Sequence, residues 1–238
     1  MKVLLAFFSN VFFNFVIGLM VASFLGPEEF GRFALALAIG LATQTIVFDW
    51  LRLGAIRFYS ERSAAEQPEL RATLDLAFGV LIVWLAIAAA IVLSLAKTPL
   101  SSDLLGLAMG TVVANAMFDY STALARARFR DGLYARLVVA KNLLAFLLIG
   151  GGAWWFRSAQ MALLGGMLSL GGSVLLLRVS LNDRDTGAGV ASRDLARQLA
   201  AYSLPIVAAN FLYLLIPLAN RWLVTTVYGF AETGQFSL

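Results

Sequence analysis

Long apolar stretches separated by short polar segments dominate this chain. Each stretch is close to 20 residues or longer, the length that a helix needs to cross about 30 Å of hydrocarbon. The stretches do not alternate between apolar and polar residues, so the strands of a membrane barrel are not indicated. We predict seven transmembrane helices, at Val3–Leu25, Phe33–Leu51, Leu74–Ala96, Leu104–Leu124, Leu137–Phe156, Ala159–Leu177 and Ala200–Tyr228.

The composition supports this interpretation. Hydrophobic residues make up 61% of the 238 residues and charged residues 13%, and the mean hydropathy is +0.83. Soluble proteins are typically about 45–50% apolar and about 25% charged. A soluble fold of this length could not bury so much apolar surface, which excludes a soluble enzyme, a disordered chain and a secreted miniprotein. We therefore expect an all-α, polytopic membrane helix bundle.

The basic residues fall mainly on one side of the predicted membrane. Fourteen of the 18 lie at the N-terminus or near the exits of the second, fourth and sixth spans, and four lie on the other side. Because basic loops stay in the cytoplasm, the bias predicts a cytoplasmic N-terminus and explains the net charge of +4 without a nucleic-acid partner. The four on the other side are Arg32, Lys97, Arg157 and Arg221.

Several kinds of chemistry have no support in the sequence. The chain contains no cysteine and no histidine, so disulfides, iron–sulfur clusters and the commonest metal ligand are missing. Its only lysines are Lys2, Lys97 and Lys141, and none follows a phosphate-binding glycine loop. Paired catalytic carboxylates do not stand out either. We expect a protein that is not an enzyme and that uses no cofactor or metal.

A short segment recurs after 203 residues. The eleven residues Leu25–Leu35 (LGPEEFGRFAL) match Tyr228–Leu238 (YGFAETGQFSL) at five positions. In the first copy Gly26 can end one helix and Pro27 can begin the next, and acidic residues favour the start of a helix. Glu232 repeats the acidic residue in the second copy.

The two copies imply a duplicated architecture. Each follows an odd-numbered span and six spans separate them, so both halves have the same orientation and are related by an axis along the membrane normal. We expect a first lobe of six helices at residues 1–178, a cytoplasmic linker at 179–199 and the start of a second lobe at 200–238. On this interpretation the chain is a fragment of a longer protein.

Three segments carry a resemblance to a known family. They are Leu25–Phe33 after the first span, Phe48–Leu53 with Arg57–Tyr59 at the exit of the second, and Asn220–Gly229 at the end of the seventh. In these segments the chain resembles the polysaccharide-biosynthesis (O-antigen and exopolysaccharide) flippases of the multidrug/oligosaccharidyl-lipid/polysaccharide exporter superfamily. The G-P-E-E-F-G element is the most specific part of the resemblance.

The resemblance implies a function. Such flippases have twelve to fourteen helices in two lobes around a cavity that opens alternately to each side of the bacterial inner membrane. They move polyprenyl-diphosphate-linked oligosaccharides for the biosynthesis of O-antigen, capsule or exopolysaccharide. The expected partners are this lipid-linked substrate, membrane lipids, and the polysaccharide polymerase and glycosyltransferases of the same process.

Polar residues within the predicted spans are the candidate site, because a charge at mid-membrane costs at least about 2.5–3.5 kcal/mol. Arginine presents five donors in a fixed fork, which suits a diphosphate. We expect Arg52, Arg57 and Arg221 to bind or steer it, and the asparagines to face sugar. The alternative is that these arginines extend to the membrane interface. The asparagines in question are Asn10, Asn14, Asn115 and Asn142.

Two acids leave a further choice open. Asp49 and Asp119 are either structural counter-ions of nearby arginines or part of proton or cation coupling. Two other functions also remain possible at this point. One is a cation-coupled multidrug exporter of the same superfamily, which would favour acidic groups. The other is a non-transporting membrane scaffold of a polysaccharide assembly complex.

Overall fold

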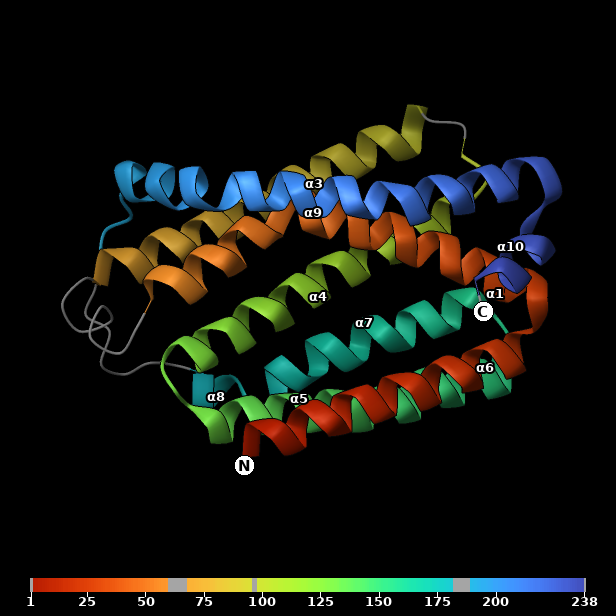
Figure 1. Cartoon of the computed structure of the whole chain (residues 1–238), viewed down its shortest axis with the longest axis horizontal. Helices are drawn as coiled ribbons and strands as arrows, with labels where there is room; N and C mark the ends of the chain where they lie inside the picture. Colours follow the sequence, from red (N-terminus) through yellow and green to blue (C-terminus); the bar gives the residue numbers. More distant parts are fainter. Residues whose placement is uncertain (1, 60–67, 96–97, 182–188, 238) are drawn as a thin grey trace.

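The computed structural model describes residues 2–59, 68–95, 98–181 and 189–237, and within these ranges the chain is almost entirely helical, with no strand. The long helices run back and forth along one axis of the molecule (Figure 1). The predicted all-α helix bundle is therefore confirmed. The elements are α1 (Lys2–Phe58), α3 (Pro68–Leu95), α4 (Ser102–Ala127), α5 (Asp131–Ala145), η1 (Phe146–Gly150), α6 (Gly151–Phe156), α7 (Ala159–Leu176), α8 (Arg178–Leu181), α9 (Arg193–Tyr228) and α10 (Phe230–Phe236).

Helix α1 contains two spans. Gly26 has φ 74° and ψ 169°, which is not helical, and Pro27 follows it. The chain reverses direction here, so that the limb at residues 2–25 and the limb at residues 27–58 lie in different parts of the bundle (Figure 1). These limbs correspond to the first and second predicted spans. Glycine is favoured at the bend because side chains disfavour positive φ.

Five helices within the described residues are long and apolar enough to span a membrane: α1, α3, α5 with its continuation to Phe156, α7 and α9. With the two limbs of α1 they account for six of the seven predicted spans. The remaining predicted span, Leu104–Leu124, is the fourth along the chain. It corresponds to α4, which is long enough but less apolar than those five helices. Helix α4 is buried along most of its length among other helices, so it has little contact with lipid and tolerates more polar residues.

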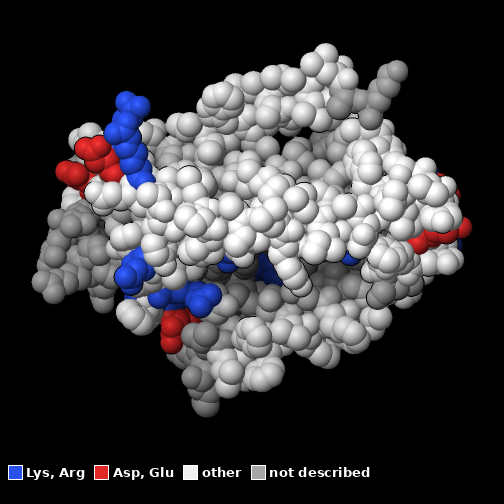
Figure 2. Space-filling model, turned by 45° about the horizontal axis from the view of Figure 1, so that its top comes forward, with Lys and Arg blue, Asp and Glu red and all other residues white. Residues whose placement is uncertain are grey.

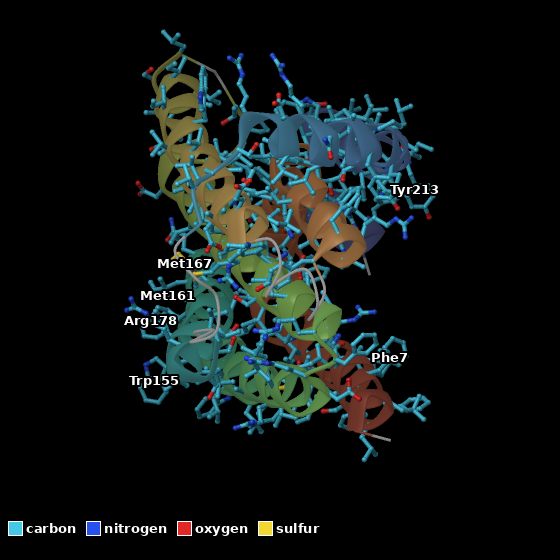
Figure 3. All side chains as sticks on the ribbon, turned by 90° about the vertical axis from the view of Figure 1, so that its left-hand side faces the viewer. Phe7, Trp155, Met161, Met167, Arg178 and Tyr213 are labelled. Carbon is cyan, nitrogen blue, oxygen red and sulfur yellow. The ribbon has the colours of Figure 1, made fainter. Side chains whose placement is uncertain are left out.

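The outer surface of the bundle is apolar. Phe7, Trp155 and Tyr213 come from three different helices, point outward (Figure 3), and are 55%, 72% and 76% exposed. Exposed apolar patches of this extent mark contact with another apolar phase, and for long apolar helices that phase is lipid. The chain is thus a membrane protein.

Charges gather at the ends of the bundle. The N-terminus, the α4–α5 turn and the starts of α3 and α9 share one end, which we call the basic end (Figure 1). Most of the blue side chains on the face in Figure 2 are on the left, next to red ones, a few blue atoms show in the hollow at the middle, and red side chains mark the right-hand end. The described basic-end arginines are Arg57, Arg71, Arg126, Arg128, Arg130, Arg136, Arg178, Arg193 and Arg197.

Helix α9 packs along the second limb of α1. A Cβ atom on Gly54 would lie 2.9 Å from Leu199 Cδ2, and the rings of Phe58 and Tyr202 meet edge to face at 5.5 Å. The helix begins at Arg193, with Ser192 as its N-cap. The last part of the expected linker at 179–199, residues 193–199, is therefore helical, because the serine caps the helix at this point.

Candidate functional site: a polar interior in the first lobe

Amide and carboxylate side chains join α1 to α4 inside the bundle. Gln44, on the second limb of α1, accepts a hydrogen bond from Asn115 Nδ2. Its Nε2 donates to Asp119 Oδ2 at 2.9 Å. Asn115 and Asp119 are four residues apart on α4, so one helix face presents both to Gln44. Membrane-embedded polar groups are usually paired in this way, because an unpaired one is costly in a medium of low polarity.

An ion pair lies one turn further along α1. Arg52 Nη2 is 3.3 Å from Asp49 Oδ2, and the Asp49 side chain is buried whereas that of Arg52 is 36% exposed. The spacing of three residues on one helix permits this pair. Asp49 is therefore a counter-ion of Arg52 in this structure, which is one of the two roles expected for it.

Lys141 connects α5 to the first limb of α1. Its Nζ donates to Asn10 Oδ1 at 2.8 Å and to Asn14 Oδ1 at 3.2 Å. Asn10 and Asn14 are one helical turn apart, so both amide oxygens face the same lysine. Lys141 is ten residues after the start of α5, about 15 Å from the basic end at 1.5 Å per residue. The lysine is thus inside the bundle rather than in a loop.

Several cavities adjoin these side chains, including one of about 200 Å³ beside Gln44 and Asn115, and two of them reach the charged groups. One, of about 170 Å³, is lined by Asn10, Arg52, Asp119 and Arg126 among others. The other, of about 380 Å³, is lined by Asn14, Asn115 and Lys141 together with apolar residues of α1, α5 and α7. We call these three groups of polar side chains together the polar interior. Its members are Asn10, Asn14, Gln44, Asp49, Arg52, Asn115, Asp119 and Lys141.

The polar interior is balanced in charge. Arg52 and Lys141 contribute two positive charges, and Asp49 and Asp119 two negative ones. An excess of positive charge comes only at its basic end, where Arg126 lines the smaller cavity. The interior can therefore accept hydrogen bonds from, and donate them to, a neutral polar molecule, whereas an anion is favoured at the Arg52–Arg126 end.

The structure brings six of the predicted site residues together and separates three. The six that belong to the polar interior are Asn10, Asn14, Asp49, Arg52, Asn115 and Asp119. The others are Asn142, Arg57 and Arg221. Asn142 is fully buried, lines neither cavity, and its side-chain nitrogen and oxygen have no hydrogen-bond partner among the described residues. Arg57 is exposed and lines neither cavity.

Arg221 lies near the opposite end of the bundle, where its Nε donates to Ser237 Oγ at 3.1 Å. It is seven residues from the end of α9, about 10 Å, whereas Arg52 is 25 residues beyond the α1 bend at the same end, about 38 Å. The expected group of three arginines around one diphosphate is therefore not formed in this conformation. The spacing of residues along a helix predicts the face on which each arginine lies, but not which other helix packs against that face.

Sequence reasoning also missed two members of the polar interior. Gln44 carried a usable signal, since a buried amide in an apolar span needs a partner. Lys141 was assigned to the basic end because it follows a basic loop. Its hydrogen bonds instead fix α5 against the first limb of α1.

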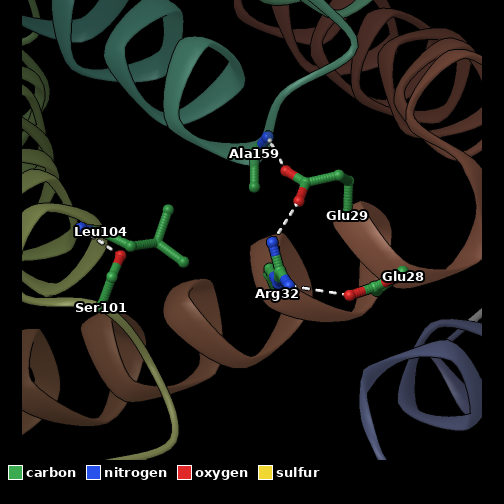
Figure 4. Close-up of polar contacts among 6 residues, drawn as sticks. All are labelled: Glu28, Glu29, Arg32, Ser101, Leu104 and Ala159. Atoms are coloured by element: carbon green, nitrogen blue, oxygen red, sulfur yellow. Dashed lines mark hydrogen bonds and ion pairs between the residues drawn. The ribbon is translucent and has the colours of Figure 1, made fainter.

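A second polar cluster lies at the opposite end (Figure 4). Arg32 pairs with Glu28 at 2.7 Å and with Glu29 at 2.6 Å. Glu29 Oε2 also accepts a hydrogen bond from the backbone N–H of Ala159, the first residue of α7, at 2.8 Å. The acid was expected to stabilise the start of its own helix, and here its carboxylate reaches the N-terminus of another helix.

The repeated segments lie against each other at this end. Gly229 has φ 98° and Gly26 φ 74°, so both copies bend in the same way. A Cβ atom added to Gly31 would overlap the carbonyl oxygen of Phe230. A Cβ atom added to Gly234 would overlap the carbonyl oxygen of Pro27. Because Gly31 corresponds to Gly234 and Pro27 to Phe230, the contact is reciprocal, as in a two-fold symmetric interface.

Comparison with known proteins finds no matching family model and no matching curated protein. A solved structure named "protein A" is similar over 99% of this chain, with a TM-score of 0.70 and 18% identity. The chain spans 57% of that protein. At this identity the similarity shows a shared fold alone. Fold and polar interior together define an all-α helix bundle with several helices that are long and apolar enough to span a membrane.

Proposed function

We propose that this protein is a flippase that moves polyprenyl-diphosphate-linked oligosaccharide across the bacterial inner membrane. The observation that carries the proposal is the polar interior, in which amides, a lysine and an arginine–aspartate pair lie next to cavities inside an apolar bundle. Such groups are costly to insert in a membrane and typically mark the path of a polar substrate. The resemblance of the three sequence segments to glycan flippases supports the same class.

The chemistry of the polar interior suits such a cargo. The amide groups of Asn14 and Asn115 line the larger cavity and can exchange hydrogen bonds with sugar hydroxyls. The guanidinium groups of Arg52 and Arg126 line the smaller cavity, where a diphosphate would meet two forks of donors. In this proposal the basic end faces the cytoplasm, as the distribution of arginines favours.

The architecture offers a way to move the cargo. The second limb of α1 packs against α9 and α10, which begin the second repeat. Two parallel repeats that rock against each other can expose one polar surface to each side of a membrane in turn. The polar interior of the first lobe would form one wall of that path.

Complementation tests the proposal. The native gene should restore surface polysaccharide in a strain that lacks its glycan flippase. Arg52→Ala should abolish or strongly reduce the polymer at normal protein levels, because it removes a cation from the cavity. Arg57→Ala is the matched control, since it removes an exposed arginine five residues along the same helix, and it should retain export. No restoration by the native gene, or equal export from both variants, would contradict the proposal.

A cation-coupled multidrug exporter is the second candidate. It is favoured by the two acids, Asp49 and Asp119, which lie in the polar interior and balance its positive charge. A drug exporter would raise resistance to cationic compounds in a sensitive strain, and Asp119→Asn would remove that resistance. A glycan flippase would leave the resistance unchanged.

A further inference from the structure

The turn between α4 and α5 places a phenylalanine where glycine is usual. Phe129 N donates to Arg126 O at 3.0 Å, and Arg130 N donates to Ala125 O at 2.8 Å. These two bonds form the Schellman motif that ends many helices, and its left-handed residue is most often glycine. Phe129 occupies that position with φ 54°. A bulky side chain is disfavoured there, because its Cβ crowds the backbone.

The Phe129 ring does not pack within the lobe. The residue is 84% exposed, more than any other large apolar residue in the described part of the chain. A position that favours glycine and gives the side chain no internal contact would ordinarily not keep a phenylalanine. A contact outside the lobe would account for the ring.

The surroundings of Phe129 are basic. Arg126, Arg128, Arg130 and Arg136 lie in the turn or in the adjoining helix ends, and Asp131 is the acidic residue among them. Arg136 is exposed, Arg130 is half-buried and Arg128 is buried, while the exposed Arg126 lines the smaller cavity. Arg130 and Arg136 are therefore the cations that can meet a ligand outside the lobe. An apolar ring within a group of arginines complements a surface that has anionic groups over hydrocarbon, which describes the headgroup region of an acidic lipid leaflet.

The geometry of the turn limits what the ring can reach. Helix α4 ends at Ala127 and α5 begins at Asp131, so only three residues connect two helices that run through the bundle. Such a short turn stays at the end of the helices, where membrane and water meet. A lipid headgroup surface is thus within reach of Phe129, whereas a partner protein would have to come to the membrane boundary.

We propose that Phe129 inserts into the leaflet at the basic end and that Arg130 and Arg136 beside it bind the phosphates of acidic lipids there. The contact fixes the depth of the α4–α5 hairpin in the membrane. It does not depend on the proposed diphosphate site, because Phe129, Arg130 and Arg136 line neither cavity of the polar interior.

Spin labelling tests this directly, because the chain has no cysteine and each introduced one is unique. The full chain would be labelled at Phe129→Cys and reconstituted into phosphatidylcholine vesicles with and without phosphatidylglycerol. Phe7→Cys serves as the lipid-facing reference and Asp194→Cys, at the exposed start of α9, as the aqueous reference. The label at position 129 should be more accessible to oxygen than to a water-soluble nickel complex, and deeper when phosphatidylglycerol is present. Nickel accessibility equal to that at position 194 in both vesicles would overturn the proposal.

A second pair of variants, Phe129→Gly and Phe129→Leu, tests the role of the ring without a spin label. Phe129→Gly should raise the melting temperature in lipid-free detergent, because it removes the left-handed strain. Added phosphatidylglycerol should then stabilise it less than it stabilises the native protein, whereas Phe129→Leu should respond like the native protein. A lower melting temperature for Phe129→Gly in detergent, or an unchanged response to phosphatidylglycerol, would mean that the ring serves the fold and would refute lipid insertion.

Discussion

A Cβ atom added to Gly31 would lie 2.9 Å from the backbone nitrogen of Gly234, so the two glycines bring the repeated segments into backbone contact. These are equivalent positions of the repeat. The two segments, which are identical at five of eleven positions, thus also share a bend, at Gly26 and Gly229, and contact each other at equivalent glycines. The two repeated segments are in backbone contact at these glycines.

We expect Gly31→Ala and Gly234→Ala each to lower the free energy of unfolding by about 1–3 kcal/mol, the usual cost of forcing extra atoms into a packed site. The added methyl group would meet backbone atoms, which cannot turn aside. Gly79→Ala is the control, because a Cβ there meets nothing within 4 Å and alanine favours a helix. Thermal unfolding in detergent measures all three. Equal stability of Gly31→Ala and Gly79→Ala would contradict the close contact.

Arg32 reinforces the same contact. Its guanidinium lies over the Phe230 ring, 5.4 Å from the centroid, while it also pairs with Glu28 and Glu29. The lobe and α10 are thus connected by one side chain as well as by the glycines.

Glu29→Ala should destabilise the protein more than Glu28→Ala does. Glu29 accepts the N–H of Ala159 and so acts as a cap for α7, a type of contact whose loss costs about 0.5–2 kcal/mol. Glu28 forms an exposed ion pair, which typically contributes about 0–1 kcal/mol. Hydrogen exchange at the first turn of α7 should also become faster in Glu29→Ala only. If exchange there is unchanged, Glu29 does not cap the helix.

Arg52 and Asp49 should show a positive coupling in a double-mutant cycle. Arg52→Gln alone leaves the buried Asp49 carboxylate without its ion-pair partner, whereas Asp49→Asn with Arg52→Gln replaces the pair by two neutral amides. Contacting pairs typically couple by about 0.5–3 kcal/mol. The double variant should therefore be more stable than the sum of the two single effects predicts. Additive effects would mean that the pair does not stabilise the fold.

Lys141→Met should loosen the first limb of α1. Methionine keeps the length and apolar stem of lysine but cannot donate to Asn10 and Asn14. Hydrogen exchange should rise in residues 4–20 and in α5. Arg136→Met is the matched control, since Arg136 is exposed on the same helix and bonds to the carbonyl of Gly132 in its own helix. Faster exchange in the control to the same degree would rule out a specific role of Lys141.

Much of the fold could be predicted because lipid imposes a simple rule. A helix that faces hydrocarbon must be apolar for about 20 residues, and six spans follow that pattern. Helix α4 departs from it for a physical reason. It is surrounded by protein, so apolar character no longer decides its length, and Asn115 and Asp119 are satisfied by Gln44 instead of water.

The site was only partly predictable. The Asp49–Arg52 pair is three residues apart and Asn10 and Asn14 are four apart, so helix geometry alone places each pair on one face. Pairing between helices depends on how the bundle packs, which the sequence pattern does not specify, and so the role of Lys141 went unseen. Arg221 could have been excluded from a group with Arg52, because the loop count already put the two on opposite sides of the membrane.

The most direct test of the central claim is a flipping assay in proteoliposomes with a short polyprenyl-diphosphate-linked oligosaccharide. The readout is the fraction of glycan that an enzyme added outside can reach over time. We predict that the native protein and Arg57→Ala move the glycan lipid between leaflets well above the rate of protein-free vesicles, and that Arg52→Ala is several-fold slower. A native protein that is no faster than empty vesicles would contradict the account.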